Sequence, residues 1–316
     1  NTTLVNGVTY VNNGNFDYMS FDGSNDYVET SKIPSQLEFY NSDYTFEAAV
    51  RFKDIDGDNF IFGTASEGNS RTLHLGARDS KVYQGHYAMD GSSDSGTLSA
   101  NVWYHIIWTY DVSASEMKMY LDGTYLADND DVNMGGESSN SDLAGTLSQS
   151  ADVLIGSWNT SGTSPFDGLI DETALWNEEL TANEITALYN SGIPLAASSS
   201  SGNYTSSTNR KGYWRHNENS GSISYDLSGN GNHGTISGAS YATPGASNLP
   251  VLSVTSSSNN ATYKIGDVIP VNVTFGAAVT VSGTPQITLE TGSSDAVVNY
   301  ASGSGGTTSV SYTHLR

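Results

Sequence analysis

The sequence predicts an all-β protein, with one antiparallel β-sandwich that carries a single short helix and a second, incomplete β-sandwich. Short runs rich in Val, Ile, Tyr and Trp recur about every ten positions between turn residues, which is the pattern of a sandwich. Tyrosine is abundant, with 19 copies, although only 36% of the residues are hydrophobic. Sandwiches need few but large side chains at alternating positions, so composition and pattern agree.

The first sandwich is predicted from its strands and turns. The expected strands are Tyr18–Phe21, Tyr44–Phe52, Asn59–Phe62, Leu73–Leu75, Trp103–Tyr110, Met117–Leu121 and Val153–Ile155. Asp-Gly pairs at 22–23, 56–57 and 122–123 favour tight turns. The pair at 122–123 lies between two apolar runs, which predicts a hairpin over Glu116–Leu126.

One helix is predicted after these strands. Thr181 and Glu184 have the spacing of a capping box, in which each side chain hydrogen-bonds an unpaired amide of the first turn. Ile185, Leu188 and Tyr189 then form one apolar face, and a glycine and a proline follow them. The helix is expected to close the sandwich at its surface.

The chain divides into four segments, which are 1–195, 196–209, 210–245 and 250–316. The first is the sandwich above, and the Ser- and Gly-rich second segment predicts a flexible linker. The third holds a predicted strand at Tyr213–Arg215 and an Asn/Gly loop at 226–234. The fourth supplies about 65 residues of sandwich pattern, against roughly 100 for a complete sandwich of seven strands. Its expected strands are Tyr263–Ile269, Val271–Phe275, Val279–Val281, Gln286–Leu289 and Val297–Tyr300.

The net charge of −22 lies on the first sandwich. Residues 1–192 hold 29 acidic and 7 basic residues, whereas the remaining residues hold 5 of each. A field of that sign repels nucleic acids and anionic lipids, so neither is an expected partner. It favours bound cations, and it equally explains solubility in salty water. No run approaches the roughly 20 apolar residues of a membrane span, and the absence of cysteine excludes disulfides.

Short motifs follow one another in a recognisable order over the first sandwich. They are Phe21–Val28, Tyr44–Val50, Trp103–Asp111, Met119–Gly123, Ile155-Gly156 with Phe166–Glu172, and Leu175–Asn177 with the capped helix. This order resembles the laminin-G-like, or concanavalin-A-like, lectin family. The resemblance implies an antiparallel jelly-roll sandwich.

One part of the family pattern is displaced along the chain. Family members begin with a strand and an Asn/Gly loop, and here the matching residues are Gly212–Trp214 and Asp226–Gly234. Either residues 210–241 begin a second, interrupted copy, or they fold back and supply the missing first strand. Folding back is favoured, because a free strand carrying Tyr213 and Trp214 would expose apolar area and an unpaired edge.

The last segment resembles the immunoglobulin-like, or cadherin-like, repeats of bacterial surface adhesins. Because strands are missing from its pattern, self-association by strand addition is one expectation for it, and truncation is the more economical one.

A calcium site is one implication of the lectin resemblance, because these jelly rolls often hold calcium near their first and last strands. The candidate ligands are Asp226, Asn230 and Asn232 on the Asn/Gly loop and Asp171 on the last strand. Oxygen ligands of this kind suit calcium. The alternative is that these residues only cap turns.

A sugar site needs aromatic faces beside hydrogen-bonding side chains. The candidates are Arg71, His74, Tyr83, His86, Tyr87 and Trp158, which fall on strands or loops that could line one sheet face. Core packing explains each of them singly without a ligand.

Catalysis is not expected. The hydrolases of this superfamily carry Glu-x-Asp-x-Glu on one strand, and the sequence lacks that pattern. Asp171 and Glu172 are neighbours, so on a regular strand they face opposite ways.

The leading hypothesis is a non-catalytic module that binds a glycan or surface polymer as part of a larger adhesin, secreted or displayed on a cell or virion surface. The alternatives are a structural part of an extracellular filament or virus fibre, and an accessory domain of a polysaccharide-degrading enzyme.

Overall fold

The computed structural model describes residues 18–64, 72–86, 89–93, 95–128, 147, 149–192, 194–218, 220–242, 251–256, 258, 269–275, 286–289, 296–302 and 310–313. They form two compact units, one up to Ala242 and one from Val251 onwards. Both units are built from antiparallel sheets, which confirms the all-β prediction. Within these ranges, no helix is long and apolar enough to cross a membrane.

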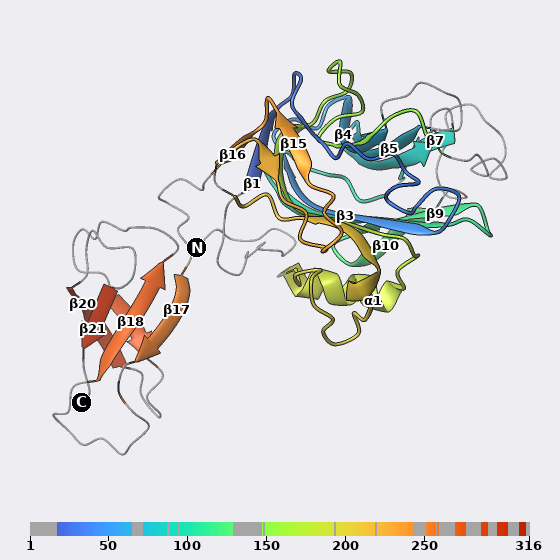
Figure 1. Ribbon diagram of the computed structural model, residues 1–316. Coiled ribbons are helices and arrows are strands. Elements are labelled where there is room, and N and C mark those ends of the chain that lie inside the picture. The colour runs from blue at the N-terminus through green and yellow to red at the C-terminus, as the bar shows by residue number, and fades with distance from the viewer. Residues whose placement is uncertain are drawn as a thin grey trace. The chain divides into compact units, whose positions relative to one another are not determined.

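Two eight-stranded sheets make up the first unit (Figure 1). The β3 sheet contains, in spatial order, β10 (Thr124–Asp128), β9 (Glu116–Leu121), β8 (Trp103–Asp111), β3 (Tyr44–Phe52), β12 (Asp167–Trp176), β1 (Tyr18–Asp22) and β16 (Ser240–Ala242), with β13 (Arg210–Trp214) also paired to β12. The β4 sheet contains β14 (Ile223–Ser224), β15 (Gly234–Ser237), β2 (Tyr27–Glu29), β11 (Val153–Ile155), β4 (Asp58–Thr64), β5 (Leu73–Arg78), β6 (Lys81–His86) and β7 (Met89–Ser92).

The predicted hairpin forms between β9 and β10. Asp122 and Gly123 have φ values of 50° and 73°, so both residues of the turn are left-handed. Two left-handed residues in sequence match the twist of the flanking strands. The local turn chemistry therefore sets the register, in which Thr124 pairs with Leu121.

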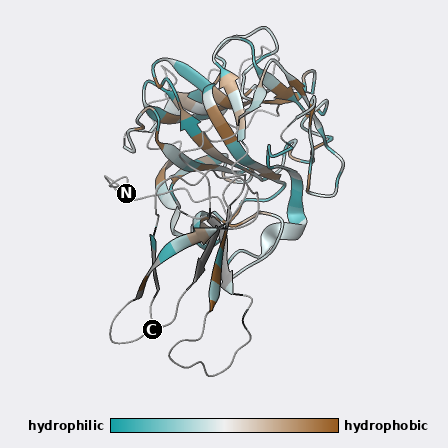
Figure 2. Ribbon diagram, turned by 90° about the vertical axis from the view of Figure 1, so that its left-hand side faces the viewer, coloured by the Kyte–Doolittle hydropathy of each residue, from teal (hydrophilic) through white to brown (hydrophobic). Residues whose placement is uncertain are grey.

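The main core fills the space between the two sheets. Alternate residues of β3, such as Phe46 and Val50, meet Phe62 of β4 and Trp108 of β8 there. All four side chains are at most 1% exposed. Figure 2 shows hydrophobic segments recurring along the strands of this sandwich, as a buried face with a period of two requires.

A second, smaller core lies on the outer face of the β3 sheet, beneath the helix. Helix α1 (Ala182–Tyr189) begins with the predicted capping box, because Thr181 and Glu184 bond each other's backbone amides. Its buried side chains Ile185 and Leu188 pack against Trp176 of β12. The helix therefore covers an apolar patch that the sandwich would otherwise expose.

The predicted flexible linker is wrong. Residues 196–205 form a loop that packs onto the same outer core, followed by a short 3₁₀ helix over Ser206–Asn209. Tyr204 is fully buried, and the indole Nε1 of Trp176 donates to its hydroxyl oxygen at 3.2 Å. Burial of one tyrosine removes a large apolar area from water. That gain is enough to fix a segment whose Ser- and Gly-rich composition favours flexibility.

The segment after this loop pairs with the first sandwich. Strand β12 is ten residues long, and its partners β1 and β13 lie end to end along one side of it. Strand β15 pairs with β2, and β16 pairs with β1. Residues 210–242 therefore belong to the first unit, in the fold-back arrangement.

The second unit contains a five-stranded antiparallel sheet. Its spatial order is β17 (Val251–Ser256), β18 (Pro270–Phe275), β21 (Val310–Thr313), β20 (Ala296–Ser302) and β19 (Gln286–Leu289). Three of the predicted strands match β18, β19 and β20, whereas β17 and β21 were not predicted. The predicted strands at 263–269 and 279–281 fall almost entirely outside the described residues. This sheet agrees with a second β region but does not establish an immunoglobulin-like fold.

Candidate functional site

Three of the predicted sugar-contacting residues come together on the outer face of the β4 sheet. Leu73 and Val82 point into the main core, so the alternation of β5 and β6 turns their neighbours His74 and Tyr83 outward. The ring centroid of His74 lies 5.0 Å from that of Trp158, edge to face.

Phe60 completes this aromatic cluster. Its ring centroid lies 4.9 Å from His74 and 5.7 Å from Tyr83. The aromatic cluster therefore consists of Phe60, His74, Tyr83 and Trp158. It is largely buried, since Phe60, His74 and Tyr83 are at most 3% exposed and Trp158 is 9% exposed.

Polar side chains surround the aromatic cluster. The Arg78 guanidinium lies 4.0 Å above the Tyr83 ring and donates from Nη1 to the Tyr83 hydroxyl at 2.7 Å. Its Nε and Nη2 both donate to the Asp58 carboxylate. These two side chains are the accessible part of the site, because Arg78 is 37% exposed and Asp58 is 29% exposed.

A second carboxylate, Asp90, faces the cluster from β7. Its Oδ2 lies 3.4 Å from Nδ1 of His74. Burial alone would raise the pKa of Asp90, but hydrogen bonds with His74 and Tyr83 outweigh burial and lower the pKa below its usual value. The site therefore combines buried aromatic rings with one guanidinium and two carboxylates. A few polar groups placed against an apolar and aromatic lining are typical of ligand-binding sites.

Sequence reasoning missed Phe60, Arg78, Asp58 and Asp90 at this site. Arg78 could have been predicted, because it lies four residues after His74 on β5 and therefore points to the same face of the sheet. A β-bulge between Phe60 and Phe62 breaks the parity of β4, so simple alternation misplaces Phe60.

His86 is placed on the opposite face of the same sheet. It lies three residues beyond Tyr83 on β6, so alternation points it into the sandwich. There its Nε2 lies 3.0 Å from the hydroxyl of Tyr44. His86 therefore does not share a face with the aromatic cluster. Arg71 and Tyr87 lie outside the described residues.

The predicted calcium loop is held by its own hydrogen bonds. Oδ1 of Asp226 accepts from the backbone amides of Tyr213 at 3.0 Å and Ser228 at 2.8 Å. Its Oδ2 accepts from the Ser228 hydroxyl at 2.8 Å and the Asn232 amide at 2.9 Å. An ionised carboxylate has about four acceptor positions. A cation at Asp226 would therefore have to displace one of these donors.

The other predicted calcium ligands also have protein partners. The side-chain amides of Asn230 and Asn232 donate to the carbonyl oxygens of Arg210 at 2.9 Å and Lys211 at 2.7 Å, and so tie the loop to β13. Oδ1 of Asp171, on β12, accepts from the next backbone amide at 2.9 Å. Among the described residues, no three His, Cys, Asp or Glu side chains are placed to hold a metal ion. Calcium binding stays a prediction.

A buried acidic cluster, not predicted from the sequence, lies on the outer face of the β3 sheet. Glu47 and His105 are joined by a 2.6 Å contact between Oε1 and Nε2, and both are buried. On β12, Glu172 accepts from the Tyr213 hydroxyl and from Arg215, with 2.8 Å to the guanidinium Nε. Burial raises the pKa of Glu172, and attraction to Arg215 opposes that rise. Glu47 could have been noticed in the sequence, because a glutamate in the middle of the apolar run of β3 indicates a buried carboxylate.

Asp171 and Glu172 do not alternate as on a regular strand. The pairing of β12 with β3 shifts register between Asp171 and Ala174, and Glu172 has a φ of 48°. Both carboxylates are buried, at 2% and 8% exposure. The bulge thus leaves Glu172 bonded to Tyr213 and Arg215, and so ties β13 to β12 at this point.

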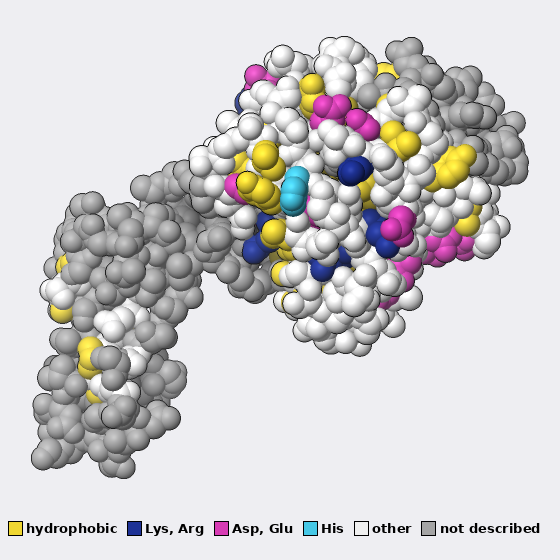
Figure 3. Space-filling view, viewed as in Figure 1, with side chains coloured by type: hydrophobic (Ala, Val, Ile, Leu, Met, Phe, Trp, Pro, Cys, Tyr) yellow, Lys and Arg dark blue, Asp and Glu magenta, His cyan; other side chains and the backbone are white. Residues whose placement is uncertain are grey.

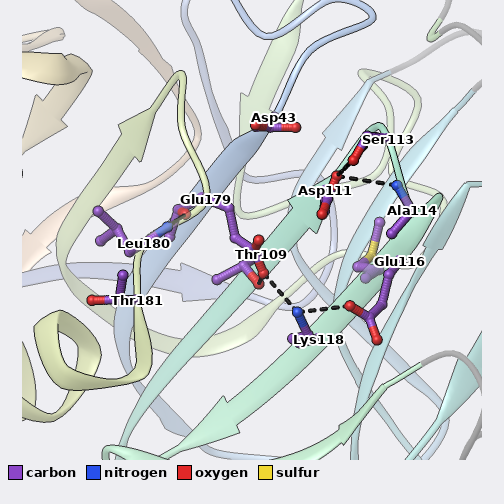
Figure 4. A network of polar contacts seen from close by, with 12 residues as sticks. Asp43, Thr109, Asp111, Ser113, Ala114, Glu116, Lys118, Glu179, Leu180 and Thr181 are labelled. Atoms are coloured by element: carbon purple, nitrogen blue, oxygen red, sulfur yellow. Dashed lines mark hydrogen bonds and ion pairs between the residues drawn. The ribbon is translucent and has the colours of Figure 1, made fainter.

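A further polar network ties the loop before α1 to the β3 sheet (Figure 4). Nζ of Lys118 lies 2.7 Å from Glu116 and 2.9 Å from Glu179, and Glu179 also accepts from the Thr109 hydroxyl. Burial acts to lower the pKa of Lys118, but its bonds to the two carboxylates raise it above its usual value. Each of these side chains bonds another side chain of the same sandwich, so the network holds the loop before α1 and does not form an open site.

Comparisons with known proteins agree with this architecture. Residues 22–186 match the family described as the concanavalin A-like lectin/glucanases superfamily. A candidate carbohydrate-binding protein from Bacteroides ovatus ATCC 8483 has a similar structure, with a TM-score of 0.51 and 22% identity over 73% of this chain and 60% of that chain. This chain therefore spans less than two thirds of that protein, and at this identity the likeness shows the fold alone.

Two further solved structures are more distant. A heptameric SAP-like pentraxin from Limulus polyphemus gives a TM-score of 0.42 and 14% identity, over 57% of this chain and 83% of that chain. The CBM40 of the Ruminococcus gnavus IT-sialidase, bound to α2,3-sialyllactose, gives a TM-score of 0.42 and 14% identity, over 54% and 95% of the two chains. No curated protein matches the chain. The family match covers more than half of the 316 residues, and the chain belongs to the concanavalin A-like lectin/glucanase superfamily.

Proposed function

We propose that this protein is a non-catalytic glycan-binding module, secreted or displayed on a surface as part of a larger adhesin. The observation that carries the proposal is the pairing of an aromatic cluster with exposed Arg78 and Asp58 on the outer face of the β4 sheet. Membership of a lectin superfamily and a similar fold in a candidate carbohydrate-binding protein support it.

The chemistry of the site favours a neutral sugar polymer. Arg78 and Asp58 present fixed donors and acceptors in a salt bridge that leaves neither charge unpaired. Asp90 adds a carboxylate close by, and the chain carries a net charge of −22. Because like charges repel, an anionic sugar would meet an unfavourable field.

Catalysis is not part of the proposal. A glycosidase needs two carboxyl groups with different roles across the scissile bond, with one kept protonated. Here Asp58 is bound to Arg78. Burial acts to raise the pKa of Asp90, but its hydrogen bonds have the larger combined effect and lower the pKa. Asp90 is therefore not set up to donate a proton, and both carboxylate oxygens of Asp58 are occupied by the Arg78 guanidinium.

Replacing Arg78 is expected to weaken glycan binding at least about tenfold, because the few side chains that anchor a ligand, arginine often among them, cost about 2 kcal/mol or more when truncated, and about 1.4 kcal/mol is a factor of ten. The experiment is a glycan array with the full chain, followed by native gel retardation in laminarin, xylan, galactan and arabinan for wild type and Arg78→Met. The matched control is Arg51→Met on β3, where the guanidinium bonds Asn101 at an exposed position.

The proposed site is excluded if Arg78→Met and Arg51→Met bind like wild type. Glycan binding itself is excluded if wild type shows no signal on the array and no retardation in any polysaccharide. Release of reducing ends from a retarding polysaccharide would contradict the non-catalytic assignment. Thermal unfolding of each variant shows whether a loss of binding reflects a loss of fold.

A further inference from the structure

The segment from Ile223 to Leu227 has an inverted pattern of burial. Ile223, Tyr225 and Leu227 are 40%, 47% and 48% exposed, whereas Ser224 is fully buried and Asp226 is 6% exposed. An extended segment at the surface normally buries its apolar side chains and exposes its polar ones. Three of the seven large hydrophobic side chains that are exposed in the described residues lie within these five positions.

Hydrogen bonds fix this inverted orientation. The Ser224 hydroxyl lies 2.9 Å from Nδ1 of buried His216, and Asp226 accepts the four loop bonds described above. The backbone amide of Leu227 donates to the carbonyl of Tyr213 at 2.7 Å. Turning the segment over would leave these polar groups unpaired in the interior, at a cost of about 1–3 kcal/mol each. The apolar side chains therefore remain outside.

The exposed side of the segment carries a ring and a fixed donor. The rings of Tyr225 and His233 meet edge to face, with centroids 5.2 Å apart. Nδ1 of His233 accepts from the Asp226 amide at 3.0 Å, so the neutral ring carries its proton on Nε2. His233 is exposed. Figure 3 shows hydrophobic side chains gathered beside a histidine on this side of the first unit.

The size of this patch argues against a protein partner. Each partner of a standard protein interface buries roughly 800 Å², or 20–30 residues. Three half-exposed side chains and one imidazole provide only a small part of that area. The apolar face of one or two sugar rings is of matching size, and a tyrosine ring with a neighbouring N–H donor suits a ligand that is apolar on one face and hydroxylated at its edges.

The charge beneath the patch selects among sugars. Oε1 of Glu218 accepts from the Tyr225 amide at 2.7 Å, which places a carboxylate directly under the segment. Its second oxygen is buried, and the Tyr241 side chain interacts with the same carboxylate. Among the residues that the structure describes, Glu218 forms no ion pair with Lys or Arg, and the chain carries a net charge of −22, so anionic sugars are disfavoured.

We propose that Ile223, Tyr225, Leu227 and His233 form a second sugar-contacting surface, specific for neutral glycans and separate from the Arg78–Asp58 site. The inference rests on the proposed glycan-binding function. Strand β14 lies at the far end of the β4 sheet from β5 and β6. Five or six strand spacings of about 4.8 Å separate them, or roughly 25 Å. Two surfaces this far apart can hold one long polymer at two points, which increases avidity without any new contact.

The test compares two tyrosines of nearly equal exposure. Tyr225→Ala removes the ring from the patch, and Tyr125→Ala on β10 removes a ring that is 45% exposed and makes a similar edge-to-face contact with Tyr120. Tyr225→Phe keeps the ring and serves as the conservative variant. Each full-length variant is assayed by gel retardation in the neutral polysaccharides named above and in alginate as the anionic probe.

The expected result is at least about tenfold weaker binding to a neutral polysaccharide for Tyr225→Ala, with Tyr225→Phe and Tyr125→Ala close to wild type. The loss should be greater for the polymer than for its tetrasaccharide, because only the polymer reaches both surfaces.

Several results would overturn the inference. Equal binding by Tyr225→Ala and wild type removes the second surface while leaving the proposed function intact. Stronger retardation in alginate than in the neutral polymers contradicts the sugar class. Concentration-dependent oligomers that Tyr225→Ala abolishes would make the patch a protein interface. Absence of any glycan binding by wild type removes both proposals.

Discussion

Trp214→Ala is expected to lower the free energy of unfolding of the first unit by about 3–5 kcal/mol, the range found when a buried aromatic side chain is truncated to alanine. Trp214 is 1% exposed and belongs to the main core. Its indole Nε1 also donates to the carbonyl of Asn232 at 2.9 Å, so the variant leaves that oxygen without its partner. Because domains are stable by only about 5–15 kcal/mol, this single change removes a large share of the total.

Urea unfolding of the full chain, monitored by tryptophan fluorescence and circular dichroism, measures this loss. The matched control is Leu227→Ala, which truncates a side chain of the same segment that is 48% exposed. It should change the free energy of unfolding by less than about 0.5 kcal/mol, as surface substitutions usually do. A loss below about 1 kcal/mol for Trp214→Ala would show that residues 210–242 are not part of the cooperative unit.

Deleting residues 209–241 extends the same test. The deletion removes β13, β15 and most of β16, and so exposes the edges of β12, β2 and β1 that they cover. Uncovered edges and an opened core favour aggregation. A deletion variant that stays monomeric with an unchanged melting temperature would contradict the fold-back arrangement.

The parts of the fold that sequence predicts well are those determined by neighbouring residues. The capping box of Thr181 and Glu184 and the turn at Asp122-Gly123 depend on side chains within a few positions of each other, and both are confirmed. The strand at Tyr44–Phe52 was predicted with its observed bounds, because Tyr, Thr, Phe and Val residues of high β propensity recur along it between turns.

Other parts depend on contacts made across the fold. Residues 196–208 have the composition of a linker, and only the apolar patch left open on the β3 sheet explains why Tyr204 is buried. The bulge that includes Glu172 could not be predicted from apolar and polar alternation along one strand, because a bulge arises from the register between two strands, here β12 and β3.

The candidate site was predicted in part for the same reason. His74, Tyr83 and Trp158 were selected as residue types that bind sugars, and the structure brings them together. His86 lies three residues beyond Tyr83 on the same strand, so alternation along β6 already places the two side chains on opposite faces of the sheet. Asp90 and Phe60 come from different strands, so only the sheet order places them beside His74. The patch at Tyr225 required knowing which side of its segment is buried, and the buried hydroxyl of Ser224 determines that.

Lowering the pH from 7 to 5 is expected to destabilise the first unit by about 2 kcal/mol through His216. This side chain is fully buried, and burial lowers its pKa from 6.5 to about 3. Between these two pKa values the unfolded chain binds a proton that the folded protein does not, so stability rises with pH in this window. The contribution is therefore complete above about pH 6.5 and is lost as the pH falls from 6.5 to 3, by about 1.4 kcal/mol for each pH unit.

The variant that isolates this contribution is His216→Asn. His216 has a φ of 55°, a left-handed conformation that Asn adopts more readily than most residues. An asparagine amide can still bond one of the two hydroxyls, of Thr173 or Ser224, that hold the imidazole at 3.0 and 2.9 Å. The variant is expected to be less stable than wild type at pH 7 but to lose about 2 kcal/mol less between pH 7 and pH 5, since its side chain does not titrate.

Urea unfolding at pH 7, 6 and 5 gives both curves. Carboxylates with lowered pKa values, such as Asp90 and Glu184, also destabilise the folded state in acid, but chiefly below the pKa values of about 4 that they have in the unfolded chain. Carboxylates whose pKa is raised by burial, such as Glu172, act in the opposite direction, but they are the same in wild type and variant. The difference between the two stability curves from pH 7 to 5 therefore reports on His216. Parallel curves for wild type and His216→Asn across this window would mean that His216 takes up its proton without unfolding, and that the Thr173–His216–Ser224 contacts do not hold the imidazole neutral.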